Sequence, residues 1–248
     1  MSRWFRALTL TLALAALSLF AASCGSNSPA QVRFVHAIQD GAAMDIDING
    51  APVFTNISFL GVLPNQPGYT TVTSGNDTIE GFLAPGETTV GFNPTSVGWS
   101  AGAQYTVVAT GLVANGNNAV ILSIPDNNSA PSSGYVEFRV IHASPSGPPV
   151  VDVYIDMNPS SGIELPVTIK GLAYTQASSY IALPFNPNND PTAPGFTVYV
   201  TASGTLTPVY IDEQVNPGSA GEIRTLVLTD VKDGTQMNSS LLELSDVD

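Results

Sequence analysis

Apolar and polar residues alternate with a period of two through much of this chain, as they do in a β-strand with one buried face. Val136, Phe138 and Val140 would share one face of such a strand, and Glu137 and Arg139 would take the other. Gly, Pro, Asn and Asp separate the apolar runs and indicate turns between strands. Further strands are expected at residues 150–155, 196–201, 205–212 and 225–229.

The chain also contains an internal repeat. Residues 33–37, Arg-Phe-Val-His-Ala, match residues 139–143, Arg-Val-Ile-His-Ala, and these two segments hold both histidines of the protein. Corresponding pieces follow in the same order, which indicates two copies of one domain. The later pairs are 45–49 with 152–156 and 102–110 with 221–229.

These patterns predict an all-β fold with two tandem antiparallel β-sandwich domains, immunoglobulin- or transthyretin-like, after an N-terminal signal peptide. Each copy has about 100 residues, the usual size of one sandwich domain. A polar, turn-rich stretch separates the copies. The expected divisions are a lipoprotein signal peptide at 1–23, a lipidated tether at 24–30, sandwiches at 31–126 and 135–248, and a linker at 127–134.

The repeated motif resembles a known family. Arg-x-x-His-Ala leads into a Gly-containing loop in both copies, and the second copy continues with Asp-x-Tyr-x-Asp. This combination is similar to the bacterial exported domain known as domain-of-unknown-function family 4397, whose members often have His-Ala-Ser-Pro-Asp at the loop. The second copy keeps Ser144 and Pro145 but has Ser146 for the aspartate, whereas the first copy keeps Asp40. The resemblance spans most of residues 31–245 and implies a sandwich-like, extracytoplasmic, usually lipid-anchored domain with no established activity.

The N-terminal segment has the layout of a secretory signal. Two arginines precede an apolar run at residues 7–22, which is shorter than the about 20 residues of a membrane span. Cys24, the only cysteine, follows three small residues, and this segment resembles the lipobox of bacterial lipoproteins. We therefore expect a lipid on Cys24 to anchor the protein to the cell envelope, with Gly25 favouring an outer membrane. The alternative is a soluble secreted protein with a stray buried thiol.

The charge of the chain argues against nucleic acid as a partner. The sequence has 20 acidic and 7 basic residues, and two of the basic ones belong to the signal. A phosphate backbone requires clustered Lys and Arg, but the remaining basic residues are scattered singly along the chain. The acidity is more consistent with keeping a crowded surface protein soluble.

Ser100 is the one candidate nucleophile. Residues 98–102 match the G-x-S-x-G pattern, in which a serine sits on a sharp turn between a strand and a helix. The residues after Ser100 are β-branched and predict a strand, so the expected helix is missing. A serine hydrolase that uses Ser100 with a histidine is therefore the less favoured alternative.

Asp40, Asp45 and Asp47 are candidate ligands of a weakly bound calcium ion. Residues 45–50 match the opening of an EF-hand loop, but Asn56 stands where that loop needs a bidentate Glu. Alternating Asp and Ile followed by Asn49-Gly50 also predicts a strand that enters a two-residue hairpin turn. Calcium is the only cofactor suggested, and the hairpin is the preferred interpretation.

His36 and His142 are expected to face inward near strand ends. Each lies on the same strand face as the apolar residues that precede it, so neither is favoured as a metal ligand or general base. A buried ring needs hydrogen-bond partners, and the repeat offers Asp45 and Asp152. Arg33 and Arg139 would reach a carboxylate from the other face or from a neighbouring strand. A structural motif of Arg, His and Asp in each copy is the resulting hypothesis.

Three functions are compatible with the sequence. The favoured one is a non-enzymatic, lipid-anchored envelope protein that acts in adhesion, in envelope structure or in binding a glycan or protein. The alternatives are a calcium-stabilised structural spacer and a hydrolase that uses Ser100. The loops at residues 64–68 and 186–194 are the expected location of any binding surface.

Overall fold

The computed structural model describes residues 28–83, 89–114, 118–157, 163, 166–185, 195–230 and 239–247. These residues form strands and turns and no helix, so the predicted all-β class is confirmed. In the first half the strands are β1 (Ala30–Ala37), β2 (Met44–Ile48), β3 (Ala51–Ile57), β4 (Val62–Leu63), β5 (Thr70–Val72), β6 (Gly75–Leu83), β7 (Thr89–Trp99), β8 (Gln104–Thr110) and β9 (Val120–Pro125). In the second half they are β10 (Tyr135–His142), β11 (Val150–Asp156), β12 (Ile169–Ala173), β13 (Ile181–Pro184), β14 (Phe196–Ala202), β15 (Val209–Val215), β16 (Ile223–Asp230) and β17 (Ser239–Val247).

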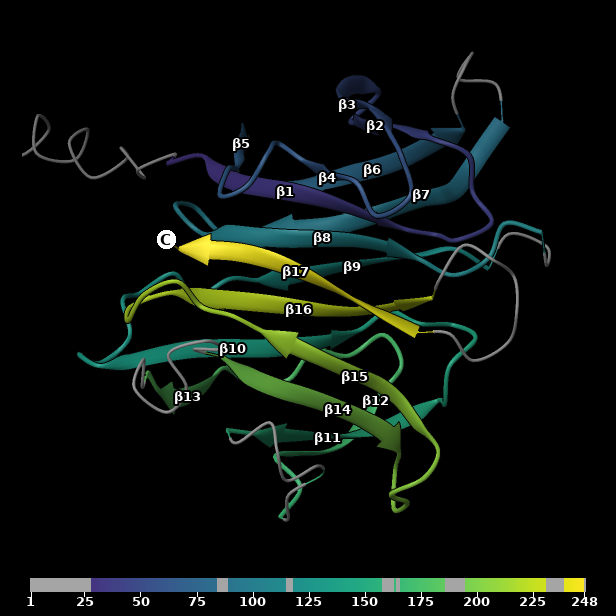
Figure 1. The fold of residues 1–248 in the computed structure, drawn as a ribbon. Helices are drawn as coiled ribbons and strands as arrows, with labels where there is room; N and C mark the ends of the chain where they lie inside the picture. The colour runs from purple at the N-terminus through teal and green to yellow at the C-terminus, as the bar shows by residue number, and fades with distance from the viewer. Residues whose placement is uncertain are drawn as a thin grey trace, which may run out of the picture.

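The strands form four sheets, two in each half of the chain (Figure 1). Sheet A has the order β4-β1-β8-β9, with β5 also paired to β1, and sheet B has the order β3-β2-β6-β7. Sheet C has the order β13-β10-β16-β17, and sheet D has the order β12-β11-β14-β15. The orders of sheets A and C correspond strand for strand, as do those of B and D.

One strand pair in each half is parallel. β1 pairs with β8 in parallel, and β10 pairs with β16 in parallel, while the other pairs are antiparallel. Each parallel pair joins the first strand of a half to a strand that follows several others, because the chain visits the opposite sheet before it returns. The sandwiches are therefore mixed at their centres and antiparallel elsewhere.

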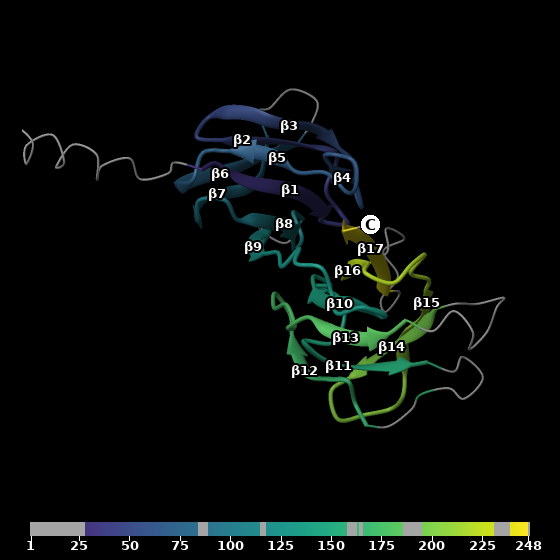
Figure 2. The ribbon, with the colours of Figure 1, turned by 90° about the vertical axis from the view of Figure 1, so that its left-hand side faces the viewer.

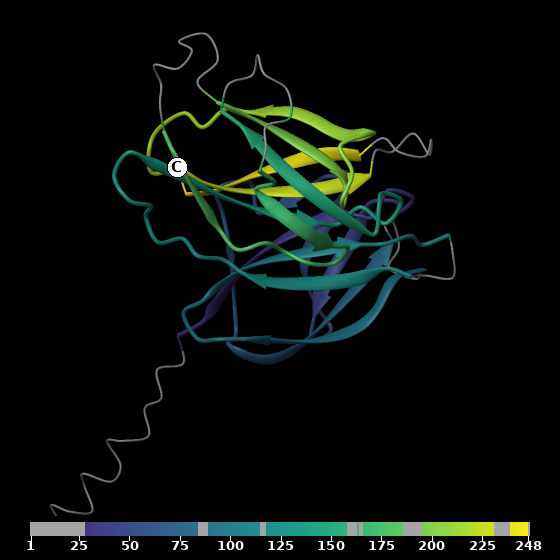
Figure 3. The ribbon, with the colours of Figure 1, turned by 90° about the horizontal axis from the view of Figure 1, so that it is seen from below.

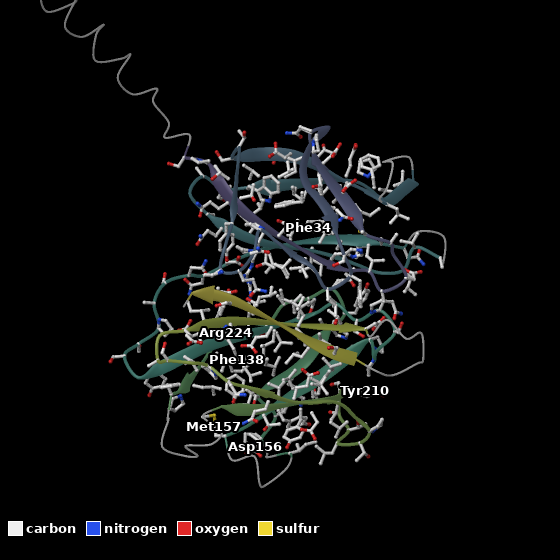
Figure 4. The ribbon with its side chains drawn as sticks, turned by 45° about the horizontal axis from the view of Figure 1, so that its top comes forward. Phe34, Phe138, Asp156, Met157, Tyr210 and Arg224 are labelled. Atoms are coloured by element: carbon white, nitrogen blue, oxygen red, sulfur yellow. The ribbon has the colours of Figure 1, made fainter. Side chains whose placement is uncertain are left out.

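Each pair of sheets encloses its own hydrophobic core. Phe34, Ile46 and Val107 are among the residues that fill the core between sheets A and B. Phe138 and Val200 are among those that fill the core between sheets C and D. Figure 4 shows Phe34 in one half of the molecule and Phe138 in the other. The inward positions on β10 are the ones that the period-two pattern predicts.

A third core joins the two sandwiches. Val35 and Val108 of sheet A pack with Ile141 and Val227 of sheet C, and all four are buried. Sheets A and C therefore lie back to back, and the molecule is a stack in the order B, A, C, D (Figures 2 and 3). The central strands are buried on both faces, which the sequence analysis did not predict.

Two local expectations have different outcomes. Asn49 and Gly50 form the turn between β2 and β3, with φ values of 54° and 73°, as a type I′ hairpin requires. The strand expected at 205–212 begins only at Val209. Residues 203–206 instead form a turn whose Gly204 amide donates a hydrogen bond to Asp152, 2.8 Å away.

Candidate functional site

The outward faces of β1 and β10 carry the two repeated arginines. Val32, Phe34 and His36 point into the first core, so Arg33 points the other way, toward sheet C. The guanidinium of Arg33 is completely buried, and Arg139 is 2% exposed. A buried charge is costly unless it is paired and hydrogen-bonded. The partners of these two arginines therefore define the interface.

Arg33 of the first sandwich binds the end of the chain. Its Nη2 pairs with Asp246 on β17, and its Nη1 donates to the carbonyl oxygen of Ser245, 2.9 Å away. Its Nε donates to Thr106 Oγ1 of β8, 2.8 Å away. Burial lowers the pKa of Arg33, but Asp246 and then Asp126 outweigh that effect and raise the pKa above its usual value.

Arg139 of the second sandwich makes the reciprocal set of contacts. Its Nη2 pairs with Asp126, which directly follows β9, and its Nη1 donates to the carbonyl oxygen of Pro125, 2.8 Å away. Its Nε donates to Thr225 Oγ1 of β16, 3.0 Å away. Each arginine thus makes its shortest ion pair with a carboxylate of the other sandwich. We call Arg33, Arg139, Asp126, Asp246, Thr106, Thr225, Tyr69 and Tyr180 the interface cluster.

Each tyrosine of the interface cluster contacts one carboxylate and one guanidinium group. Tyr69 donates to Asp126 at 2.8 Å, and Tyr180 donates to Asp246 at 3.2 Å. The guanidinium of Arg33 lies 5.2 Å from the ring centre of Tyr69, and that of Arg139 lies 4.8 Å from the ring centre of Tyr180. Burial and nearby carboxylates raise the pKa of both phenols, so both are neutral donors at neutral pH.

The interface cluster is not predicted by the sequence pattern. That pattern places Asp126 at the edge of a polar linker, whereas the carboxylate of Asp126 is completely buried. The relevant signal was the apolar residues Val35 and Ile141, each two positions after the repeated arginine on the face expected to be polar. Apolar residues on both faces of a strand indicate burial on both faces. Because the arginines are buried, they do not form a phosphate-binding surface.

His36 and His142 are buried and face inward, as predicted. The predicted hydrogen bonds to Asp45 and Asp152 are wrong. The Nε2 of His36 contacts the carbonyl oxygen of Ala42 at 2.9 Å, and that of His142 contacts the carbonyl oxygen of Pro148 at 2.8 Å. The loop after each strand folds back on the ring, so its backbone supplies the partner. Burial lowers the pKa of His142.

The aspartates of the repeat instead fix turns within their own sheets. Asp152 is 3% exposed and accepts hydrogen bonds from the amides of Gly171 and Gly204 and from Ser203 Oγ, at 2.7 to 3.0 Å. Burial alone would raise the pKa of Asp152, but these donors outweigh it and lower the pKa. Asp45 accepts only the amide of Asn56, at 2.6 Å, within the part of the chain that the structure describes.

The suggested calcium ligands do not converge. Asp40 accepts hydrogen bonds from the amides of Val113 and Ala114, at 2.9 and 2.8 Å, and so ties the loop after β1 to the loop after β8. Asp45 and Asp47 lie on β2. Among the described residues, no three His, Cys, Asp or Glu side chains form a group suited to a metal ion.

In the second copy Asp230 has the role that Asp40 has in the first. Asp230 is the last residue of β16 and accepts hydrogen bonds from Ser144 Oγ and from the amide of Ser146, the residue that stands where the first half has Asp40. In the second half the carboxylate therefore lies at the end of β16 and binds the loop after β10. These aspartates are therefore structural.

Ser100 lies on the turn between β7 and β8, and no helix follows it. Its backbone amide donates a hydrogen bond to the phenol oxygen of Tyr105, 2.9 Å away. Gln31 pairs with Gln104 and His36 pairs with Ala109 in the same parallel ladder, so the turn and His36 lie at opposite ends of β1, about 16 Å apart by strand rise. The neighbouring Trp99 is 3% exposed and belongs to the first core.

The remaining expectations concern Cys24 and the two loops proposed as a binding surface. Cys24 and the loop at 186–194 lie outside the described residues. In the loop at 64–68, the side-chain oxygen of Gln66 accepts the amide of Ser245 from the second sandwich, so this loop supports the interface. Within the ranges that the structure describes, no helix is long and apolar enough to cross a membrane.

Two solved structures are distantly similar to this chain. A CBM26 module of Eubacterium rectale Amy13K, solved in complex with maltoheptaose, is 12% identical, with 86% of this chain and 95% of that chain covered and a TM-score of 0.28. The Bacillus anthracis TIE protein is 10% identical, with 88% and 44% covered and a TM-score of 0.23. No curated protein matches the sequence, and the comparisons indicate no enzyme family.

A family match agrees with the motif. The model of a domain of unknown function, DUF4397, matches residues 30–154. This range holds the whole first sandwich and continues through the repeated Arg-x-x-His-Ala motif of β10 into β11. The match spans just over half of the sequence, and the chain belongs to the DUF4397 family.

Proposed function

We propose that this protein is a non-enzymatic module of the cell envelope, anchored through a lipid on Cys24, whose two family domains act as one rigid unit. In this role it holds a surface for a glycan or protein ligand at a fixed distance and angle from an outer membrane. We further propose that residues 127–134 link the two domains and that residues 135–248 are a second copy of the family domain.

The observation that carries the proposal is the reciprocal pairing in the interface cluster. Arg33 with Asp246 and Arg139 with Asp126 cross the boundary in opposite directions, and apolar residues surround them. Separating the sandwiches would expose that apolar surface to water, at about 25 cal/mol per Å², and would break both ion pairs. Independent motion of the two halves is therefore disfavoured.

The functions of the other candidate groups support a structural role. The repeated histidines and aspartates bind backbone groups of neighbouring segments, and the turn that carries Ser100 lies at the opposite end of β1 from His36. Each polar group that the repeat shares is therefore used for folding. A ligand would be bound by surface that differs between the copies.

Cleavage of the linker tests the rigid unit. In the test variant, a protease recognition sequence replaces Ser129–Ser133, a segment in which Ser129, Ser132 and Ser133 are exposed. The folded variant is then cut with the protease. The two fragments are expected to elute together as one complex, with the uncut protein as control. Fragments that separate without denaturant would contradict the proposal.

Labelling tests the anchor. Cells that express the full chain are fed a labelled fatty acid, and label is expected on the wild-type protein but not on Cys24→Ala. The control is Ser26→Ala, which changes the tether without removing the thiol. Label on the Cys24→Ala protein, or a soluble wild-type protein, would contradict lipid anchoring.

A further inference from the structure

A pocket of about 540 Å³ opens at one end of the first sandwich. Its apolar wall is formed by Ile48 of β2, Val53 of β3 and Val72 of β5. The polar residues that line it are Asn49, Asp77, Thr71, Thr73 and Ser74. The interface cluster contributes no residue to it, so this pocket is separate from the surface on which the proposed rigid unit depends.

Asp77 stands at a position that the fold uses for core packing. In sheet B Asp47 pairs with Glu80, and in sheet D Tyr154 pairs with Tyr199. Counting along β6 and β14 from these pairs, Asp77 of the first copy corresponds to Phe196 of the second.

Phe196 is 2% exposed and packs against Phe138, with ring centres 5.2 Å apart. The second copy therefore shows what this position does when it only supports the fold. In the first copy a smaller, charged side chain replaces the aromatic ring, and a pocket lies beside it. A carboxylate in place of a core phenylalanine costs stability, so its presence indicates a use other than packing.

The Asp77 carboxylate is fixed by one oxygen and open at the other. Asp77 is 8% exposed, and its Oδ1 accepts a hydrogen bond from Asn49 Nδ2 at 2.7 Å. Asn49 is itself held, because its Oδ1 accepts the amide of Thr78 at 2.9 Å. The Oδ2 of Asp77 accepts no hydrogen bond from the described residues and is not sealed from solvent. It is therefore an accessible acceptor on a residue that lines the pocket.

The charge on this acceptor has no protein counterion in the pocket. No Lys, Arg or His is among the described residues that line it. The whole chain has a formal charge of −13, so the surrounding potential also attracts cations. A neutral ligand would leave the carboxylate charge uncompensated, whereas a cationic one would neutralise it.

We propose that this pocket binds a small organic cation with a primary ammonium group on an apolar stem. The ammonium group has three donors, and the residues that line the pocket carry three acceptors for it: Asp77 Oδ2 and the hydroxyl groups of Thr71 and Thr73. The methylene stem lies against Val53 and Val72. An alkyl diamine and the side chain of lysine both present this chemistry.

Titration of the soluble chain tests the proposal. Residues 25–248 are titrated with n-butylamine, 1,4-diaminobutane and Nα-acetyl-lysine methylamide, while backbone amide shifts are followed by NMR. Saturable shifts confined to the segments around Thr71–Ser74 and Asn49 are expected, and the affinity should fall as salt is added. 1-Butanol has the same stem without the charge and is expected to give no saturable shift.

Two variants of strand β6 provide the matched comparison. Asp77→Asn removes the charge but keeps an oxygen that can accept from Asn49, and it is expected to weaken amine binding about tenfold or more. Glu80→Gln removes one charge from the same strand at a position outside the pocket lining and should change the affinity less than about twofold.

Each other outcome overturns the proposal. Equal losses in Asp77→Asn and Glu80→Gln would show non-specific attraction of cations. Equal shifts with sodium ions would show a simple cation site, and binding of butanol or a neutral sugar in preference to the amines would show a site for uncharged ligands. If the folded protein gave no saturable shift with any of the amines, the pocket would not bind primary ammonium groups. None of these results bears on the rigid unit, which the linker cleavage tests separately.

Discussion

Arg33 and Asp246 are separated by 213 positions in the sequence and form an ion pair in which both side chains are completely buried. The pair joins the first strand of the first sandwich to the last strand of the second. Arg139 and Asp126 make the equivalent pair in the opposite direction. The repeated arginine of the motif therefore serves the contact between the two sandwiches rather than the interior of either one.

Loss of one member of these pairs is expected to destabilise the protein strongly. Arg139→Met leaves the buried Asp126 carboxylate without its main counterion and should lower the free energy of unfolding by about 3–5 kcal/mol. The double variant Arg139→Met/Asp126→Leu removes both charges and should recover most of that loss. Urea denaturation measures both values.

The pair of Arg224 with Glu222 is the control for this experiment. The side chains of Arg224 and Glu222 are 17% and 7% exposed, whereas those of Arg139 and Asp126 are 2% and 0% exposed, so water reaches part of the control pair and Arg224→Met should cost less than Arg139→Met. A loss for Arg139→Met as small as that for Arg224→Met would show that the interface cluster contributes little to stability. A double variant no more stable than the single one would place the loss in packing rather than charge.

The sequence predicted the parts of the fold that depend on local pattern. The alternation around Phe138 gives the inward face of β10, and Asn49-Gly50 gives the hairpin, because strand period and turn chemistry are local properties. The pairing of Arg33 with Asp246 is not local, since it depends on how two whole sheets pack. The partners of the histidines were missed for a related reason: backbone carbonyl groups are acceptors that every residue carries, so sequence does not distinguish them.

The candidate pocket could be found only by combining sequence with register. Asp77 lies in a polar stretch that reads as a turn or a strand edge, and nothing nearby marks it as a core position. Its equivalence to Phe196 follows from the strand pairs of sheets B and D. Two sandwiches with corresponding sheet orders can therefore be compared strand by strand.

Alkaline pH is expected to destabilise the protein through the interface tyrosines. Burial raises the pKa of Tyr69 and Tyr180 in the folded state, so above pH of about 10 the unfolded chain releases protons that the folded protein retains. Stability should be complete below pH of about 10 and should fall as the pH rises further. Melting temperatures between neutral and strongly alkaline pH measure this effect.

The variant Tyr69→Phe/Tyr180→Phe separates this effect from general alkaline denaturation. It should be less stable than the wild type at neutral pH, because two hydrogen bonds to buried carboxylates are lost. Its decline above pH of about 10 should be shallower. Parallel declines in the two proteins would mean that other groups control alkaline unfolding.

Mild acid is expected to destabilise the protein through His142. Burial lowers the pKa of His142 in the folded state, so as the pH falls below about 6.5 the unfolded chain takes up a proton more readily than the folded protein. The contribution is present above that pH and is lost as the pH falls toward the lower folded value. His142→Gln should flatten this part of the stability profile, and an unchanged profile would assign the loss to other groups.

The Asp152 carboxylate is expected to order the turn that carries Leu206, a residue 47% exposed. Asp152→Ala removes the acceptor for two amides and a hydroxyl group and should cost about 1–3 kcal/mol, because these donors lose their partner. Hydrogen exchange at the amides of Gly171 and Gly204 should accelerate. Asp45→Ala, at the matching position of the first copy, removes one exposed hydrogen bond and should cost less than about 1 kcal/mol. Equal costs at the two positions would show that the copies use this aspartate in the same way, contrary to the different contacts seen here.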